Sequence, residues 1–139
     1  MDEHFIPSRL RLAEALAPAG HADTALTQTE HAFAAAPAQP RVRETRAFVL
    51  AATGRREDAR HGLAALAAER NVRYVSAWEI ARAYAVMAYT DEALRWLQAA
   101  VDERAPMTLF AAVHAALDPV RDDPRFAGIL RSIDIARRA

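Results

Sequence analysis

The segment Val75–Arg104, VSAWEIARAYAVMAYTDEALRWLQAAVDER, predicts two amphipathic helices joined by a tight turn. Small side chains occupy the positions where the two helices must approach each other, and larger apolar side chains surround them. The small residues are Ala81, Ala93 and Ala100, and the larger ones are Ile80, Tyr84, Leu94, Leu97 and Val101. A helical pair of this kind exposes apolar faces that it cannot bury alone, so it requires similar pairs beside it.

The upstream sequence contains two such pairs. The first, within residues 7–36, is interrupted by Pro18-Ala19-Gly20 and resumes near Asp23, which is the predicted N-cap of the second helix. The second pair follows Pro40 and turns at Gly54. Proline is favoured in the first turn of a helix, and glycine is favoured just after the last turn. The placement of both residues therefore favours pairs of helices.

Four sequence columns recur at an interval of 34 residues through the three pairs. They are Ala13, Ala47 and Ala81; Leu16, Leu50 and Tyr84; Gly20, Gly54 and Ala88; and Ala25, Ala59 and Ala93. The third pair therefore turns at alanine rather than glycine. Thr90 or Asp91 is the predicted N-cap of its second helix. Four columns that share the same 34-residue interval rarely arise by chance.

A helix–turn–helix unit of about 34 residues resembles the tetratricopeptide repeat. That family places small residues at repeat positions 8 and 20, a large residue at 11 and a small turn residue at 15, and the four columns occupy those positions. Position 4, which prefers tryptophan, departs from the pattern with Arg9, Arg43 and Ala77. The resemblance implies an all-α fold: a right-handed α–α superhelix, or solenoid, of three helix–turn–helix repeats with C-terminal capping helices. The repeats would fill residues 1–106, at about 6–39, 40–73 and 74–107, and the caps 107–139.

The C-terminal half is similar to a narrower group, the bacterial tetratricopeptide modules at the C-termini of signalling proteins and transcriptional regulators. The matching motifs are Tyr74-Val75-Ser76, Ile80-Ala81 with Tyr84-Ala85, Ala93-Leu94-Arg95-Trp96-Leu97, and Asp118-Pro119 with Asp123-Pro124-Arg125-Phe126. This resemblance implies an interaction or regulatory module rather than an enzyme.

Residues 107–139 are predicted to close the array rather than to repeat it. TLFAAVHAAL, residues 108–117, predicts a short helix that Asp118-Pro119 breaks. A last helix then begins with Asp123 as N-cap and Pro124 at its first position. A terminal helix with a polar outer face is what a repeat array needs at its exposed end.

Composition narrows the functional classes. The chain has 139 residues with 18 basic and 18 acidic side chains, so its zero net charge predicts neither nucleic-acid nor membrane binding. It has no cysteine, which removes thiolate chemistry and suits the cytoplasm. No apolar run reaches the ~20 residues of a membrane span, and the acidic N-terminus does not resemble a secretory signal. We expect a soluble cytoplasmic protein.

The sequence predicts no catalytic, cofactor-binding or metal-ligating residues. No two of the five histidines are spaced i, i+4, and the acidic pairs are adjacent, so their carboxylates diverge on a helix. There is no nucleophile elbow and no glycine-rich phosphate loop. We therefore expect a protein that is not an enzyme.

The predicted partner-binding residues lie on the first helices of the second and third repeats. They are Arg41, Glu44, Phe48, Trp78 and Arg82, on the concave groove of the expected superhelix. Aromatic residues and arginine dominate binding hot spots, so this set suits an extended or helical peptide. Trp78 has an alternative interpretation, packing inside the array. If it binds a partner, removing Trp78 and Arg82 together should abolish capture without loss of helix.

Three functions remain open at this point. The favoured one is a non-catalytic scaffold that binds a protein or peptide partner in its groove. The second is a homo-oligomerisation module, because repeat ends and alanine-rich faces can stack into a homodimer. The third is a regulatory or sensor domain of a larger bacterial system, for which the sequence offers no pocket with converging polar groups.

Overall fold

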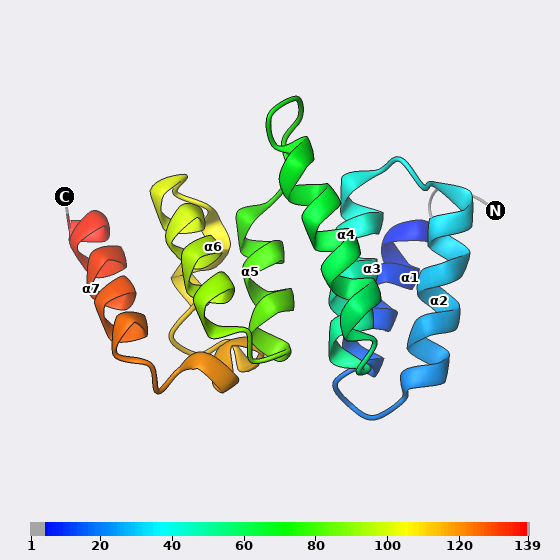
Figure 1. Cartoon of the computed structure of the whole chain (residues 1–139), viewed down its shortest axis with the longest axis horizontal. Helices are drawn as coiled ribbons and strands as arrows, with labels where there is room; N and C mark the ends of the chain where they lie inside the picture. The colour runs from blue at the N-terminus through cyan, green and yellow to red at the C-terminus, as the bar shows by residue number, and fades with distance from the viewer. Residues whose placement is uncertain (1–4, 139) are drawn as a thin grey trace. The chain divides into compact units, whose positions relative to one another are not determined.

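The computed structural model describes residues 5–138, and every regular element within that range is helical (Figure 1). The elements are α1 (Phe5–Leu16), α2 (Ala22–Ala35), α3 (Pro40–Ala52), α4 (Arg56–Glu69), α5 (Ala77–Val86), α6 (Thr90–Asp102), the short 3-10 helices η1 (Pro106–Phe110) and η2 (Ala115–Val120), and α7 (Pro124–Arg138). The all-α prediction is confirmed. None of these helices has both the length and the apolar content needed to cross a membrane.

The chain divides between Val75 and Ser76 into two compact units. In the first unit α1 packs against α2 and α3, α2 packs against α3, and α3 packs against α4. Figure 1 shows α3 and α4 side by side. The buried side chains of this unit include two small apolar clusters, one of Ile6, Leu10, Ala32 and Val42 and one of Ala13, Ala17, Ala25 and Val49.

In the second unit α6 lies between α5 and α7 (Figure 1). The 3-10 helix η2 packs against α5 and α6, and η1 packs against α6. Their shared core combines large side chains from every element of the unit except η1, among them Trp78, Leu97, Leu117, Phe126 and Ile129. Burial of such side chains is the main stabilising term for a unit of this size.

The alanines that the sequence places at helix contacts are all buried. They are Ala13 and Ala25 in the first pair, Ala47 and Ala59 in the second, and Ala81 and Ala93 in the third. The helices of each pair also pack against each other, as α1 with α2, α3 with α4 and α5 with α6. A methyl group at the contact allows two backbones to approach closely, so these positions tolerate little added volume.

The turn of each pair adopts the left-handed backbone conformation at the same column. The φ angles are +88° at Gly20, +84° at Gly54 and +60° at Ala88. Glycine adopts this conformation without a steric penalty, whereas the Cβ of alanine approaches the following carbonyl oxygen. The third turn therefore has the same shape as the others but carries strain that they lack.

Ala88→Gly is expected to stabilise the protein by about 0.5–1 kcal/mol. Relief of left-handed strain is worth about 1–2 kcal/mol, and the greater freedom of glycine in the unfolded chain offsets part of that gain. Urea unfolding followed by circular dichroism measures the change. The reverse control is Gly54→Ala, which should lose a comparable amount because no heavy atom lies within 4 Å of the added Cβ. An unchanged or lower midpoint for Ala88→Gly would contradict the strain argument.

Two predicted helix starts are wrong by one or two residues. The N-cap of α2 is His21, and Asp23 lies in the first turn; the N-cap of α6 is Tyr89, with Asp91 in the first turn. Neither cap makes a side-chain hydrogen bond, so the acids stabilise these helix ends through the helix dipole rather than as caps. The Asp123 prediction is confirmed, since its Oδ1 accepts a 2.9 Å hydrogen bond from the Arg125 backbone N–H.

The predicted single helix over residues 108–117 is wrong. The chain instead forms η1, a turn and η2, and Pro119 lies inside η2 rather than ending a helix. Tertiary contacts override the alanine-rich composition here, because Arg121 donates hydrogen bonds to the carbonyl oxygens of Ala112 and His114. These carbonyls belong to the turn between the two short helices, so their capture favours a turn over a continuous helix.

Candidate functional site

The five predicted partner-binding residues lie on two helices that belong to different compact units. Arg41, Glu44 and Phe48 are on α3, and Trp78 and Arg82 are on α5. The Arg41 side chain is 48% exposed, whereas the other four residues are buried. A hot-spot side chain must reach its partner, so Arg41 offers more contact surface than the rest. The binding role of the set stays a prediction.

On α3, Arg41 and Thr45 both bind a carboxylate from α1. The Arg41 guanidinium lies 3.2 Å from Oε1 of Glu14, and the Thr45 hydroxyl donates a 2.9 Å hydrogen bond to the same oxygen. Thr45 is buried and Arg41 is half exposed, so this network runs from the interior to the surface. It joins α1 to α3, and the Arg41 side chain at its outer end is about half exposed.

On α5, Arg82 is neutralised by its own helix. Its Nε donates a 2.6 Å hydrogen bond to Oε2 of Glu79, three residues earlier, and both side chains are largely buried. A buried charge is tolerated when it is paired, and removing one partner leaves the other uncompensated. The pair therefore supports α5 more directly than it offers charge to a partner.

Trp78 is the largest fully buried side chain, with 1% of its surface exposed. The His114 ring lies edge-on to it, at 5.5 Å between ring centroids and 79° between planes. Nδ1 of His114 accepts a 3.2 Å hydrogen bond from the Ala116 N–H and caps η2. This arrangement agrees with the packing interpretation of Trp78. This ring contact could not be predicted from the sequence, because His114 lies in a segment whose structure was predicted wrongly.

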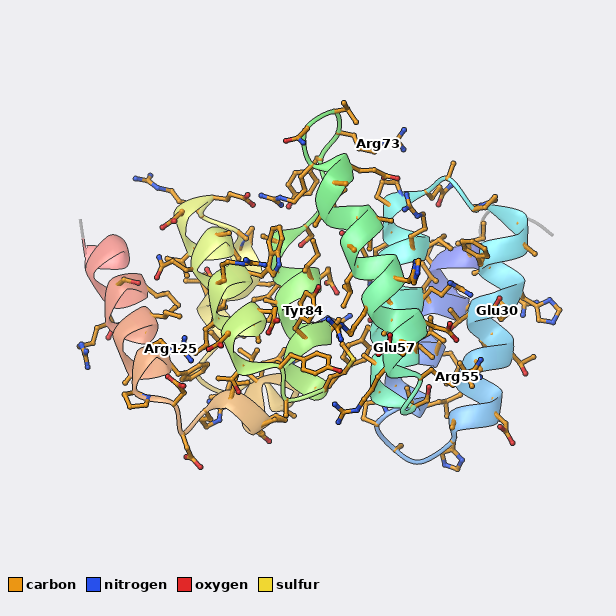
Figure 2. The ribbon with its side chains drawn as sticks, viewed as in Figure 1. Glu30, Arg55, Glu57, Arg73, Tyr84 and Arg125 are labelled. Carbon is orange, nitrogen blue, oxygen red and sulfur yellow. The ribbon has the colours of Figure 1, made fainter. Side chains whose placement is uncertain are left out.

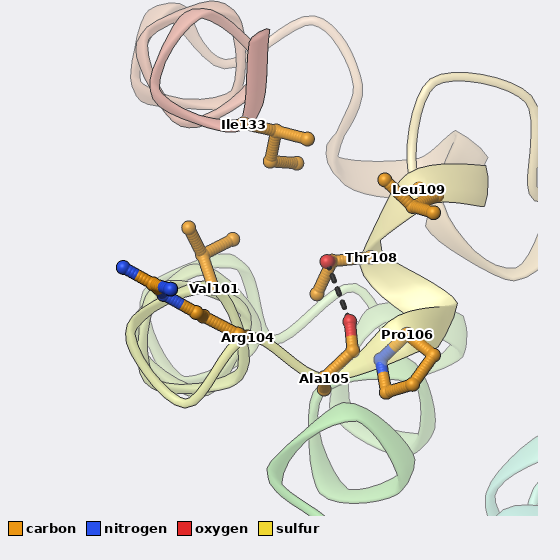
Figure 3. A pocket seen from close by; sticks show the side chains of 7 residues that line it. All are labelled: Val101, Arg104, Ala105, Pro106, Thr108, Leu109 and Ile133. Atoms are coloured by element: carbon orange, nitrogen blue, oxygen red, sulfur yellow. Dashed lines mark hydrogen bonds between the residues drawn. The ribbon is translucent and has the colours of Figure 1, made fainter. Parts of the chain in front are cut away.

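A pocket of about 200 Å3 opens between α6, η1 and α7 (Figure 3). Its lining is mostly apolar and consists of Val101, Arg104, Ala105, Pro106, Thr108, Leu109 and Ile133. The Thr108 hydroxyl donates a 2.7 Å hydrogen bond to the Ala105 carbonyl oxygen, and Figure 3 shows the Arg104 side chain directed away from the pocket. The pocket suits an apolar group. Its walls come from three separate elements, so no sequence motif marks it.

An exposed apolar surface adjoins this pocket, and we call it the η1 apolar patch. It consists of Met107 (41% exposed), Leu109 (55%), Phe110 (53%) and Val113 (78%). Large apolar side chains that are scattered singly over a surface need no explanation, but four within seven residues form a contiguous group. The sequence pattern predicts these residues in the C-terminal capping segment, and their exposure could not be predicted from it.

Ion pairs connect the helices and keep their carboxylates charged. Arg125, labelled in Figure 2, binds Asp123 at 2.9 Å and Asp91 of α6 at 2.8 Å. The hydrogen bond from Arg125 lowers the pKa of Asp123, and the hydrogen bond from Arg43 lowers the pKa of Glu69. Carboxyls shifted in this direction stay ionised at neutral pH, so both ion pairs are fully charged there.

Over residues 5–138 the structure brings no three of the histidine, aspartate and glutamate side chains together as metal ligands. No protein-family model matches the chain, and neither a curated protein nor a solved structure shows significant similarity to it.

Proposed function

We propose that this chain is a non-catalytic helical-repeat scaffold of the tetratricopeptide type, which binds a protein or peptide partner. One observation carries the proposal. Three consecutive helical pairs turn through a left-handed residue at the same column, Gly20, Gly54 and Ala88, each 34 residues after the last. Gly20 and Gly54 adopt this conformation without strain, whereas Ala88 adopts it with steric strain. The same conformation at the same column in spite of that strain favours a repeated unit over three unrelated turns.

The buried alanines support the same proposal. Each pair contributes one to its first helix and one to its second, at the repeat positions that the family reserves for small residues. In the proposed superhelix α1, α3 and α5 line the concave face, α2, α4 and α6 form the outer layer, and α7 covers the end of the array. Extended concave surfaces of this kind bind peptides and protein segments.

Arg41 is the residue that we propose to contact the partner most directly. Its guanidinium is half exposed and held in place by Glu14, so it is pre-organised for an acceptor group such as a carboxylate or a backbone carbonyl. The buried members of the predicted set, Glu44, Phe48, Trp78 and Arg82, act by shaping α3 and α5. The proposed partner is a protein or peptide, without direct nucleic-acid or membrane contact.

Arg41→Ala is expected to reduce partner capture about tenfold, because loss of an arginine hot spot commonly weakens binding by that much or more. The measurement is quantitative affinity capture with the immobilised protein, followed by titration of the captured partner. Thermal unfolding should be nearly unchanged, since exposed ion pairs contribute little to stability.

The matched control is Arg55→Ala. Arg55 has a comparably exposed side chain, 56%, and also pairs with a carboxylate, that of Asp58, but it precedes α4 on the proposed outer layer. Loss of capture in the Arg41 variant alone supports the concave-face assignment. Equal capture by wild type and both variants would reject it, and equal loss in both would point to a general charge effect.

A further inference from the structure

We propose that the η1 apolar patch is a homodimer interface, in which Phe110 of one copy inserts into the pocket beside Leu109 of the second copy. This inference goes beyond partner binding on the first helices of the repeats. It concerns a different surface, formed within the second compact unit by η1 and the ends of α6 and α7. Its occupant is a second copy of this chain.

The geometry of η1 directs the patch outward. Side chains three residues apart lie on the same face of a 3-10 helix. Thr108 and Ala111 are buried, whereas Met107, Phe110 and Val113, also spaced by three, are exposed. The hydroxyl of Thr108 binds the Ala105 carbonyl oxygen and fixes the inward face. Met107 and Phe110 therefore share the outward face of η1, and Val113 is exposed in the turn that follows it.

The exposed patch supplies about half of the area that each partner buries in a standard interface. The exposed fractions of the four patch residues correspond to about 400 Å2 of mainly apolar surface. A standard interface buries about 800 Å2 on each partner, and roughly 65% of a homodimer interface is apolar. The patch and the adjoining pocket walls supply most of that apolar share. The polar residues at their edges complete the area.

The surface is complementary to itself, which favours a second copy over an unrelated partner. A two-fold interface places the same surface on both sides, so that surface must carry both halves of every contact. Here the projecting Phe110 ring is adjacent in sequence to Leu109, which lines the pocket. The pocket measures about 200 Å3, and a cavity of about 150 Å3 is already large enough for benzene.

Charge also permits this contact. The segment from Ala105 to Val113 contains no ionisable side chain, and the net charge of the whole chain is zero. Two copies can therefore meet here without burying like charges. Arg104 lies at the margin, and because its side chain is directed away from the pocket it can stay hydrated in the dimer (Figure 3).

The first test measures the mass of the full chain by size-exclusion chromatography with light scattering over a range of concentrations. We expect a dimer, and Phe110→Ser should weaken its dissociation constant about 30-fold or more, as loss of an aromatic hot spot does. The control is Val72→Ser, which removes an apolar side chain that is 81% exposed in the other compact unit. This variant should dimerise like the wild type.

The second test distinguishes insertion of the Phe110 ring into the pocket from nonspecific hydrophobic association. Val101→Phe fills the pocket from its wall and should also weaken the homodimer. Mixed in equal amounts, the Phe110→Ser and Val101→Phe chains should form a mixed dimer more readily than either forms a homodimer, because one supplies the pocket and the other the ring. Differently tagged copies make this dimer measurable, and circular dichroism checks that both variants are folded.

Three results would overturn the proposal. The wild-type chain could be a monomer at every usable concentration, which would leave the patch for another occupant. The dimer could persist in Phe110→Ser and be lost in Val72→Ser, which would move the interface to the first unit. The two folded variants could fail to form a mixed dimer beyond the level of each alone, which would exclude ring-in-pocket contact.

Discussion

Trp78→Ala is expected to lower the free energy of unfolding by about 3–5 kcal/mol. The indole is fully buried among the helices of the second unit and borders the His114 ring, so its removal leaves a large cavity and ends the edge-on contact. Single domains are stable by only about 5–15 kcal/mol, so the variant would keep little of its stability. Urea unfolding monitored by circular dichroism measures the loss.

Trp96→Ala is the matched control for this result. Trp96 is only partly buried and packs at the edge of the same core, next to Arg95. Its removal should cost clearly less than removal of Trp78. A loss below about 1 kcal/mol for Trp78→Ala, the level of a typical surface or conservative change, would show that the indole is not packed as described.

The burial of Trp78 also changes how one binding test must be interpreted. The sequence predicts that a double variant without Trp78 and Arg82 loses its partner and keeps its helices. Both residues are buried, and Arg82 pairs with Glu79. Loss of capture by that variant would therefore report unfolding of the second unit as much as loss of contact, whereas Arg41→Ala avoids this ambiguity.

Ala81→Leu is expected to destabilise the protein by about 1–3 kcal/mol, because a well-packed helix contact cannot accept three more carbon atoms without strain. Ala81 is fully buried in the core that α5 shares with α6. Leucine and alanine are both good helix formers, so the cost is one of packing rather than of helix propensity. Chemical denaturation measures it.

Ala64→Leu provides the control, because Ala64 is exposed on α4 and should change stability by less than about 0.5 kcal/mol. If the alanine column is equivalent in the three pairs, Ala13→Leu and Ala47→Leu should each cost about as much as Ala81→Leu. A large cost at one position and none at the other two would argue against a repeated unit.

The repeated features could be predicted from sequence because each depends on local rules. The left-handed conformation is least strained at glycine, so Gly20 and Gly54 mark the turns of the first two pairs, and the 34-residue spacing predicts the third turn at Ala88. The buried alanines follow from the same spacing. Helix starts were less predictable, since His21 and Tyr89 precede helices without a side-chain cap and no residue preference marks them.

The segment from Pro106 to Val120 could not be predicted, because distant contacts decide its structure. Its composition favours one α-helix, but hydrogen bonds from Arg121 and the packing of η2 on α5 select two short 3-10 helices. The candidate site could not be predicted for the same reason, because contacts between residues distant in sequence form it. The burial of Trp78 depends on side chains from α6, η2 and α7 that pack in the same core, and the pocket exists only when α6, η1 and α7 meet.

The position of Arg121 has a consequence for control of the dimer surface. This guanidinium binds two carbonyl oxygens, the Asp118 carboxylate and the face of the Phe126 ring, at the start of the chain segment that leads to α7. It thus ties the far end of the patch to the hydrophobic interior. A substitution at residue 121 would therefore alter self-association by changing how the Val113 end of the patch is held.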